Sequence, residues 1–102
     1  MIHIYYHRSM HRVTVRGHAL SGEVGRDLVC AAVSTLTYTL VEFVRSIEAE
    51  KTDIRLYKGR AYVSASVSEN KKERLTNGFD DICRGFRILA ENFPKNVSFC
   101  EA

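Results

Sequence analysis

The sequence has no apolar run that approaches the roughly 20 residues of a membrane-spanning helix. Its N-terminal stretch, MIHIYYHRSMHR, contains neither the apolar core nor the small-residue cleavage site of a secretory signal peptide. Only three cysteines are present, and an odd number at wide spacings does not build a disulfide framework but fits a reducing compartment. We therefore expect a cytoplasmic protein that binds no membrane.

The sequence also lacks a cluster of one charge sign. Fifteen basic and twelve acidic residues give a net charge of +3, and they are scattered without a stripe of alternating basic and aromatic residues. Such a mild excess is weak support for a nucleic-acid protein, so no direct nucleic-acid binding is expected.

A metal site is not indicated either. His3, His7 and His11 are the obvious candidates, but strand alternation places His11 on the face opposite the other two. No cysteine or carboxylate lies near them in the sequence to complete a ligand set. We therefore predict no metal and no cofactor.

What is present is an ordinary globular chain of 102 residues, with 45% hydrophobic and 26% charged residues. Residues 2–7 alternate between apolar and polar side chains, and residues 11–17 do so again. A two-residue loop, Arg8-Ser9 or Ser9-Met10, would join them as a hairpin. Its register must pair even positions of the first strand with odd positions of the second, because only that buries both apolar sets together.

A helix is predicted from about residue 27 to residue 47, with Asp27 as its N-cap. Its apolar residues repeat at spacings of three and four, which is the pattern of a buried stripe. These residues are Val29, Val33, Leu36, Leu40, Val44 and Ile47. A second stripe, about a quarter turn away, contains Cys30, Ser34, Thr37 and Val41, and it places Cys30 at the edge of the core.

The second half of the chain is predicted to contain another hairpin, another helix and a last strand. Residues 53–57 and 60–67 form a hairpin around Lys58-Gly59, and Asn70 with Glu73 resembles a capping pair that opens a second helix. Gly78 and Gly85 flank its apolar stripe, which indicates close approach to the first helix. Pro94 ends this helix, and residues 96–100 form a last strand. The stripe itself contains Leu75, Phe79, Ile82, Phe86, Leu89 and Phe93.

The predicted order is therefore ββαββαβ. Each strand has one apolar face and each helix one apolar stripe, so we expect an α/β two-layer sandwich with both helices on one face of a mixed sheet. No linker, repeat or low-complexity segment divides the chain, and residues 1–102 are predicted to form a single domain.

The chemistry is concentrated in residues 17–34, GHALSGEVGRDLVCAAVS. Cys30 falls in the first turn of the predicted helix, where the positive end of the helix dipole favours a thiolate over a thiol. His18 precedes it across a loop that contains Gly22 and Gly25, and a nearby imidazole would make the thiol a nucleophile. Strand alternation continued past Val15 turns His18 away from the core, so Gly17 must break the strand.

Gly17-His18-Ala19 and the stretch GRDLVCAAVS, residues 25–34, together resemble the ribosomal-processing cysteine protease family, Prp (YsxB-like). The family pairs a GHA motif with a helix start of the form G-x-D-[IL]-V-C-A-A-V-S, and Leu28 stands where isoleucine is commoner. The resemblance extends over the whole chain.

This resemblance implies that His18 is the catalytic histidine, that Cys30 is the nucleophile and that Ser34 is a polar residue near the site. Backbone N–H groups at the helix start near Asp27 and in the loop from Gly22 to Gly25 are expected to hold the oxyanion. It further implies a homodimer that removes the N-terminal extension of bacterial large-subunit ribosomal protein L twenty-seven, with the cut after an aromatic residue.

Two other functions remain open at this point. One is a non-catalytic ribosome- or RNA-associated module, and the other is a different thiol-dependent enzyme, such as an acyl transferase with the same dyad. Among the remaining thiols, Cys83 is expected in the core and Cys100 in strand packing. Outward-facing tyrosines are expected to line an interface or a peptide groove. They are Tyr5, Tyr38, Tyr57 and Tyr62.

Overall fold

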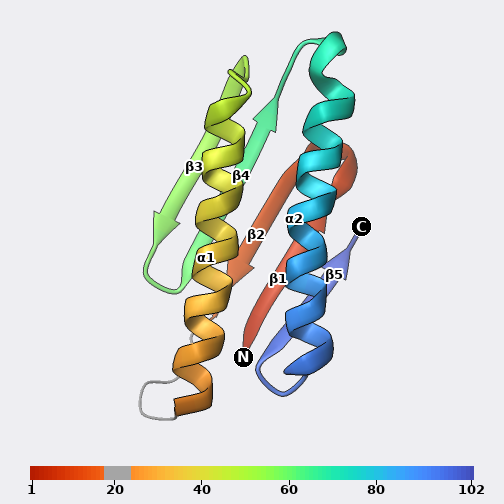
Figure 1. Ribbon diagram of the computed structural model, residues 1–102. Helices are drawn as coiled ribbons and strands as arrows, with labels where there is room; N and C mark the ends of the chain where they lie inside the picture. The colour runs from red at the N-terminus through yellow and green to blue at the C-terminus, as the bar shows by residue number, and fades with distance from the viewer. Residues whose placement is uncertain (18–23) are drawn as a thin grey trace.

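The computed structural model describes residues 1–17 and 24–102, with the side chains of residues 24–27 excepted. Five strands form one sheet in the order β3-β4-β2-β1-β5, in which β1 and β5 are parallel and the other pairs are antiparallel. Both helices lie on the same face of this sheet (Figure 1). The predicted two-layer sandwich is thus confirmed. The elements are β1 (Ile2–His7), β2 (Arg12–Arg16), α1 (Val24–Ser46), β3 (Lys51–Tyr57), β4 (Arg60–Ser66), α2 (Lys72–Asn92) and β5 (Val97–Glu101), with 3₁₀ turns at Arg8–Met10 and Glu69–Lys71.

The first hairpin has the predicted parity but a wider connection. Ile4 pairs with Val15 and Tyr6 with Val13, so even positions of β1 face odd positions of β2. The last pair joins His7 to Arg12, which leaves residues 8–11 as the connection instead of a two-residue loop. A 3₁₀ turn followed by His11 at φ 47° closes it. A four-residue connection gives the same pairing of even with odd positions as a two-residue loop, because both contain an even number of residues.

The core lies between the sheet and the helices, and most of the predicted stripe residues are buried there. Thr37 and Val41 also point inward on α1, whereas Leu36 is only partly buried. On α2, Cys83 is buried as expected, but Phe93 at the end of the stripe is 42% exposed because α2 ends at Asn92, before it.

The two predicted helix starts are wrong. α1 begins at Val24, so Asp27 is its fourth residue and not its N-cap. α2 begins at Lys72 after a 3₁₀ turn, and no side chain caps it. Ser68 Oγ instead donates a hydrogen bond of 2.6 Å to Asn70 Oδ1, so the Asn70–Glu73 capping pair does not form. The local hydrogen bond occupies the oxygen that would have accepted a backbone N–H.

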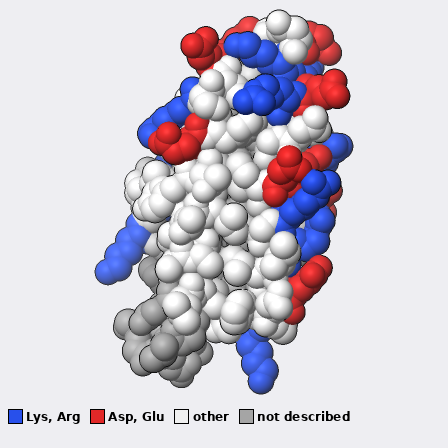
Figure 2. Space-filling view, in the orientation of Figure 1, with Lys and Arg blue, Asp and Glu red and all other residues white. Residues whose placement is uncertain are grey.

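One segment of α1, Leu28–Ser46, is long and apolar enough to cross a membrane by length and composition, so the expectation that no apolar run approaches this length is wrong. This is weak support for a membrane span, because the central helix of a two-layer domain meets the same test. Here Val29, Leu40 and Val44 are buried in the core. Figure 2 shows uncharged residues over the middle of the helix layer, with charged residues along its edges and upper end.

The two helices pack closely at Gly78 and Gly85, as the sequence predicts. A Cβ atom placed on Gly78 would lie 2.0 Å from Cζ of Phe43 on α1. A Cβ atom on Gly85 would lie 2.7 Å from Cδ2 of Leu36, the flexible end of a side chain. The absence of a side chain at these two positions is therefore what sets the distance between the helices.

Replacing Gly78 with alanine is expected to destabilise the protein by about 1–3 kcal/mol, because the added methyl group overlaps the ring of Phe43, which is partly buried against the core. This loss outweighs the gain of roughly 1 kcal/mol in helix propensity. Urea unfolding should show a smaller loss for Gly85→Ala, since Leu36 can change rotamer. Adding Phe43→Leu to Gly78→Ala should recover part of the stability, and an additive double variant would contradict the contact.

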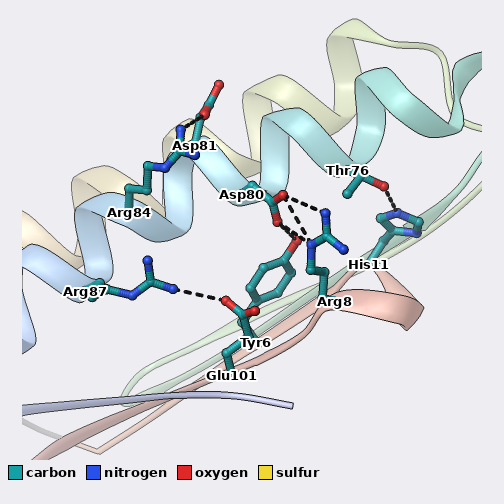
Figure 3. Close-up of polar contacts among 9 residues, drawn as sticks. All are labelled: Tyr6, Arg8, His11, Thr76, Asp80, Asp81, Arg84, Arg87 and Glu101. Atoms are coloured by element: carbon teal, nitrogen blue, oxygen red, sulfur yellow. Dashed lines mark hydrogen bonds and ion pairs between the residues drawn. The ribbon is translucent and has the colours of Figure 1, made fainter.

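A polar network joins the end of β1 to the middle of α2 (Figure 3). The Tyr6 hydroxyl donates a hydrogen bond of 2.7 Å to Oδ1 of Asp80, and the Arg8 guanidinium donates to both oxygens of the same carboxylate. Nearby, a hydrogen bond of 2.7 Å joins His11 Nε2 to Thr76 Oγ1. The network fixes α2 on the sheet at the end opposite Gly17.

The Arg8 guanidinium, with the Tyr6 hydroxyl, holds the pKa of Asp80 below its usual range. A carboxylate with a depressed pKa in the folded state stabilises the fold above its unfolded pKa, and this stabilisation is lost as the pH falls through the folded pKa. We expect Asp80→Asn to be less stable than the wild type at pH 6, with the difference shrinking toward pH 2.5. Urea midpoints at the two pH values measure it, and a constant difference would contradict the ionic role of Asp80.

Candidate active site

Cys30 lies on the side of α1 that faces the β3–β4 hairpin. Its side chain is half-buried, as the second stripe predicts, with Thr37 buried and Ser34 exposed farther along the same side. It is the seventh residue of α1, about 9 Å along the axis from the first. The dipole effect fades within the first turn, so the predicted placement of Cys30 at the helix start is wrong.

Cys30 lines a pocket of about 310 Å³, near the lower end of the range for ligand pockets. Most of the residues that line the pocket are apolar, and the turn between β3 and β4 forms one of its walls. The α1 side contributes Val33, Ser34, Thr37 and Tyr38, the sheet contributes Ile2, Val15, Leu56 and Ala61, and the turn contributes Tyr57, Lys58, Gly59 and Arg60. A thiol in the wall of a concave, mostly apolar pocket can attack a carbonyl carbon of an extended peptide that binds there.

Gly17 forms part of the same wall, where β2 ends. Its φ of +115° is a conformation that residues with side chains rarely adopt. A Cβ atom there would lie 2.1 Å from the carbonyl oxygen of Met1, and the Gly17 N–H donates a hydrogen bond of 3.0 Å to the carbonyl of Gly59. The predicted break in strand alternation at Gly17 is confirmed.

The structure describes only some of the other predicted site residues. His18 and Gly22 lie outside the described residues. Gly25 and Asp27 belong to the first turn of α1. The free N–H groups of a helix are its first four, here those of residues 24–27. These residues precede Cys30 by about one helical turn. The N–H groups at the helix start, which were expected to hold the oxyanion, are therefore separated from the thiol.

The other two thiols do not line this pocket. Cys83 is buried on α2, and burial raises its pKa to about 12, so it stays protonated at neutral pH. Cys100 is exposed on β5, which makes its predicted role in strand packing wrong. In the part of the chain that the structure describes, no three histidine, cysteine or acidic side chains group as metal ligands.

The β3–β4 turn is the part of the site that sequence reasoning missed. Both hairpins were predicted, but their alternation does not say which strands become neighbours. The pairing of β2 with β4 places Arg16 opposite Arg60 and thereby brings the turn to Gly17. Of the four tyrosines expected in an interface or groove, Tyr38 and Tyr57 line the pocket. Tyr5 and Tyr62 alternate with buried residues and point to the opposite face of the sheet.

Comparisons with known proteins give a family match over almost the whole chain. Residues 1–98 match the family model described as cysteine protease Prp. A relative from Mycoplasma pneumoniae, named ribosomal processing cysteine protease Prp, is 28% identical over 92 residues, which cover 89% of this chain and 87% of the relative.

Solved structures have the same fold. A Streptococcus mutans protein has a TM-score of 0.73 and 28% identity, with 98% of this chain and 90% of that chain covered. The ribosomal processing protease Prp from S. aureus, in complex with a substrate peptide, has a TM-score of 0.76 at 18% identity, with 99% and 97% covered. A second structure of that protease, with a covalently linked product peptide, has a TM-score of 0.75 at 20% identity over the same shares.

Proposed function

Because the chain belongs to the Prp family of cysteine proteases, we propose that it is a thiol endopeptidase with Cys30 as nucleophile and His18 as general acid and base. The observation that carries this proposal is the position of Cys30 in the wall of an apolar pocket, beside the glycine that ends β2 directly before His18. Cys83 and Cys100 lie outside that pocket.

The reaction follows from the chemistry of the two residues. Cys30 Sγ, as a thiolate, attacks the carbonyl carbon of the scissile peptide and forms a tetrahedral oxyanion. Collapse of the oxyanion breaks the C–N bond, and the His18 imidazolium gives its proton to the departing amine. His18 then removes a proton from water as the water oxygen attacks the thioester carbon; the C–S bond breaks, which releases a carboxylic acid and regenerates the Cys30 thiolate and the His18 imidazolium.

The substrate is proposed to be the N-terminal extension of bacterial large-subunit ribosomal protein L twenty-seven, cut after an aromatic residue. Two features support this choice: the family resemblance, and an apolar pocket of a size suited to one large side chain. Tyr38 and Tyr57 at its mouth add aromatic surface for such a residue. The resemblance also supports a homodimer, and the three widely spaced cysteines support a cytoplasmic location.

The test is incubation with a synthetic peptide that spans the junction of the extension and the mature protein. Mass spectrometry should show two fragments whose masses sum to that of the peptide plus one water. Alanine in place of the aromatic residue before the cut should lower kcat/KM by roughly 10²-fold, because the pocket stays unfilled. Equal cleavage of both peptides would contradict the substrate assignment, and no cleavage of either would contradict the proposed activity. Sedimentation equilibrium tests the dimer separately.

A further inference from the structure

The face of the sheet opposite the helices, here called the outer face, is not covered by any element that the structure describes (Figure 1). It is made of the strand residues that alternate with the buried ones. On β1, for example, Ile4 and Tyr6 are buried, whereas Tyr5 between them is 41% exposed. An uncovered sheet face of five strands is a large surface with no structural partner in this chain.

The outer face carries the positive charge of the protein. Its charged residues are Arg12, Arg16, Lys51, Arg55, Arg60 and a single acid, Asp53. Of the fifteen basic and twelve acidic residues in the sequence, ten and eleven therefore lie elsewhere. The charges are scattered along the sequence, but strand alternation and the β2–β4 pairing collect these six on one surface.

Two of these cations face each other directly. The register pairs Arg16 with Arg60 on one side and with His3 on the other. Like charges at directly opposite positions destabilise a sheet. The single acid of this face, Asp53, is already paired with Arg55 at 2.8 Å. Repulsion between Arg16 and Arg60 is therefore not neutralised by an acid of this face, which indicates an anionic partner.

A second pair of arginines on this face is ordered by an aromatic ring. The guanidinium groups of Arg12 and Arg55 lie 5.3 Å and 5.2 Å from the centroid of the Tyr62 ring. Stacking on the ring holds each guanidinium in place, and Arg55 also donates hydrogen bonds to both carboxylate oxygens of Asp53. Arg12 Nε is buried and has no hydrogen-bond partner among the described residues.

On the helix layer the positive charges are largely neutralised, because basic residues lie beside acidic ones (Figure 2). Examples are the pair Arg45–Glu42 on α1 and the pair Arg84–Asp81 on α2.

A second copy of the chain is a poor partner for the outer face. Two-fold contact would bring the same surface, with its unneutralised arginines, against itself.

In place of the expectation that the protein binds no nucleic acid, we propose that the outer face binds single-stranded RNA. Arginines and a lysine would contact phosphates, and exposed tyrosines would stack on bases, as in sheet-based RNA-binding modules. Tyr5 is 41% exposed on this face, and Tyr62 lies on the same face beside Arg12 and Arg55. A hollow of about 420 Å³ lies between β1 and β2, lined by His3, Tyr5, His7, Thr14 and Arg16. It offers an aromatic ring and hydrogen-bonding groups side by side.

The choice of RNA over DNA rests on the proposed function, since a precursor of a ribosomal protein is found with ribosomal RNA. RNA binding is therefore measured on Cys30→Ala protein, and peptide cleavage is measured without RNA, so that either proposal can fail alone. The probe is a fluorescein-labelled RNA of mixed sequence, about 12 nucleotides long. Fluorescence anisotropy gives the affinity between 50 and 200 mM salt.

In this background, Arg16→Glu is expected to weaken RNA binding at least about tenfold and to reduce the magnitude of the log–log salt slope by about 0.7 or more. Its melting temperature should be unchanged or higher, because a carboxylate opposite Arg60 replaces a like-charge pair. Tyr5→Leu should weaken binding about fivefold or more through lost stacking, with the salt slope unchanged. The matched charge reversal on the helix layer, Arg45→Glu, should change the affinity less than about twofold.

The proposal would be overturned by an absence of RNA binding at 50 mM salt, or by an equal loss in Arg16→Glu and Arg45→Glu. Equal affinity for DNA of the same sequence would overturn the assignment to RNA. Binding that is insensitive to Tyr5→Leu and is competed equally well by poly-glutamate would show instead that the face takes acidic protein segments.

Discussion

Replacing Cys30 with alanine is expected to lower the rate of peptide cleavage by roughly 10⁴-fold or more, because Cys30 is the only thiol among the described residues that line the pocket. The fold should be retained, since Cys30 lies at the edge of the core and is only half-buried. Urea unfolding should show a change of at most about 1 kcal/mol for this removal of one sulfur atom.

The matched control is Cys100→Ala, which removes an exposed thiol on β5. Its cleavage rate should equal that of the wild type. The assignment of the nucleophile would be wrong if Cys30→Ala retained the wild-type rate, or if the two variants lost activity equally.

Gly17→Ala is expected to reduce both stability and activity. The substitution places a Cβ atom 2.1 Å from the backbone oxygen of Met1 and 3.1 Å from Cα of Ile2, and neither can move without shifting β1. The φ of +115° adds strain for any residue with a side chain. Together these effects are expected to lower the free energy of unfolding by about 2–4 kcal/mol.

The effect of Gly17→Ala on cleavage should exceed what instability explains. Gly17 forms part of the pocket wall and directly precedes His18, so a shift here changes the distance between the proposed base and Cys30. A displacement of about 1 Å can lower kcat by roughly 10²-fold.

Gly78→Ala is the suitable control for Gly17→Ala, because it strains the helix interface outside the pocket. Assays run at a temperature where both variants are folded should show near wild-type cleavage for Gly78→Ala. Equal kcat values for the two variants would contradict a special role for Gly17.

Periodicity was sufficient to predict most of the fold. The alternation in residues 2–7 and 11–17 fixed which residues of β1 and β2 face each other, and the two glycines on α2 were predicted as helix contacts. These features depend on local spacing and on the need to bury one face of each element, and both can be read from the sequence.

The errors concern places where local signals compete. Asp27 is a good N-cap and Gly25 disfavours a helix by roughly 1 kcal/mol, so the sequence favours a start at Asp27, whereas the helix begins at Val24. At α2, Asn70 is held by Ser68 and does not cap. Small preferences of this kind are easily overridden when a helix is held by its packed face.

The candidate site was only partly predictable for a different reason. The two hairpins are separated along the chain by α1, and alternation within each does not determine that β2 lies beside β4. The turn with Lys58 and Gly59, which completes the wall of the pocket, therefore could not be assigned to Cys30 from the sequence. The outer face went unrecognised for the same reason, because Arg16 and Arg60 become neighbours only through that pairing.

The most direct test of Cys30 as the nucleophile is mass spectrometry of the enzyme quenched in acid during turnover of the junction peptide. We expect a mass increase equal to the N-terminal fragment minus water, located on the peptide that contains Cys30 and lost on treatment with hydroxylamine. The adduct should be absent from Cys30→Ala protein. Steady cleavage without any adduct on Cys30, or an adduct on Cys83 or Cys100 instead, would contradict this chemistry.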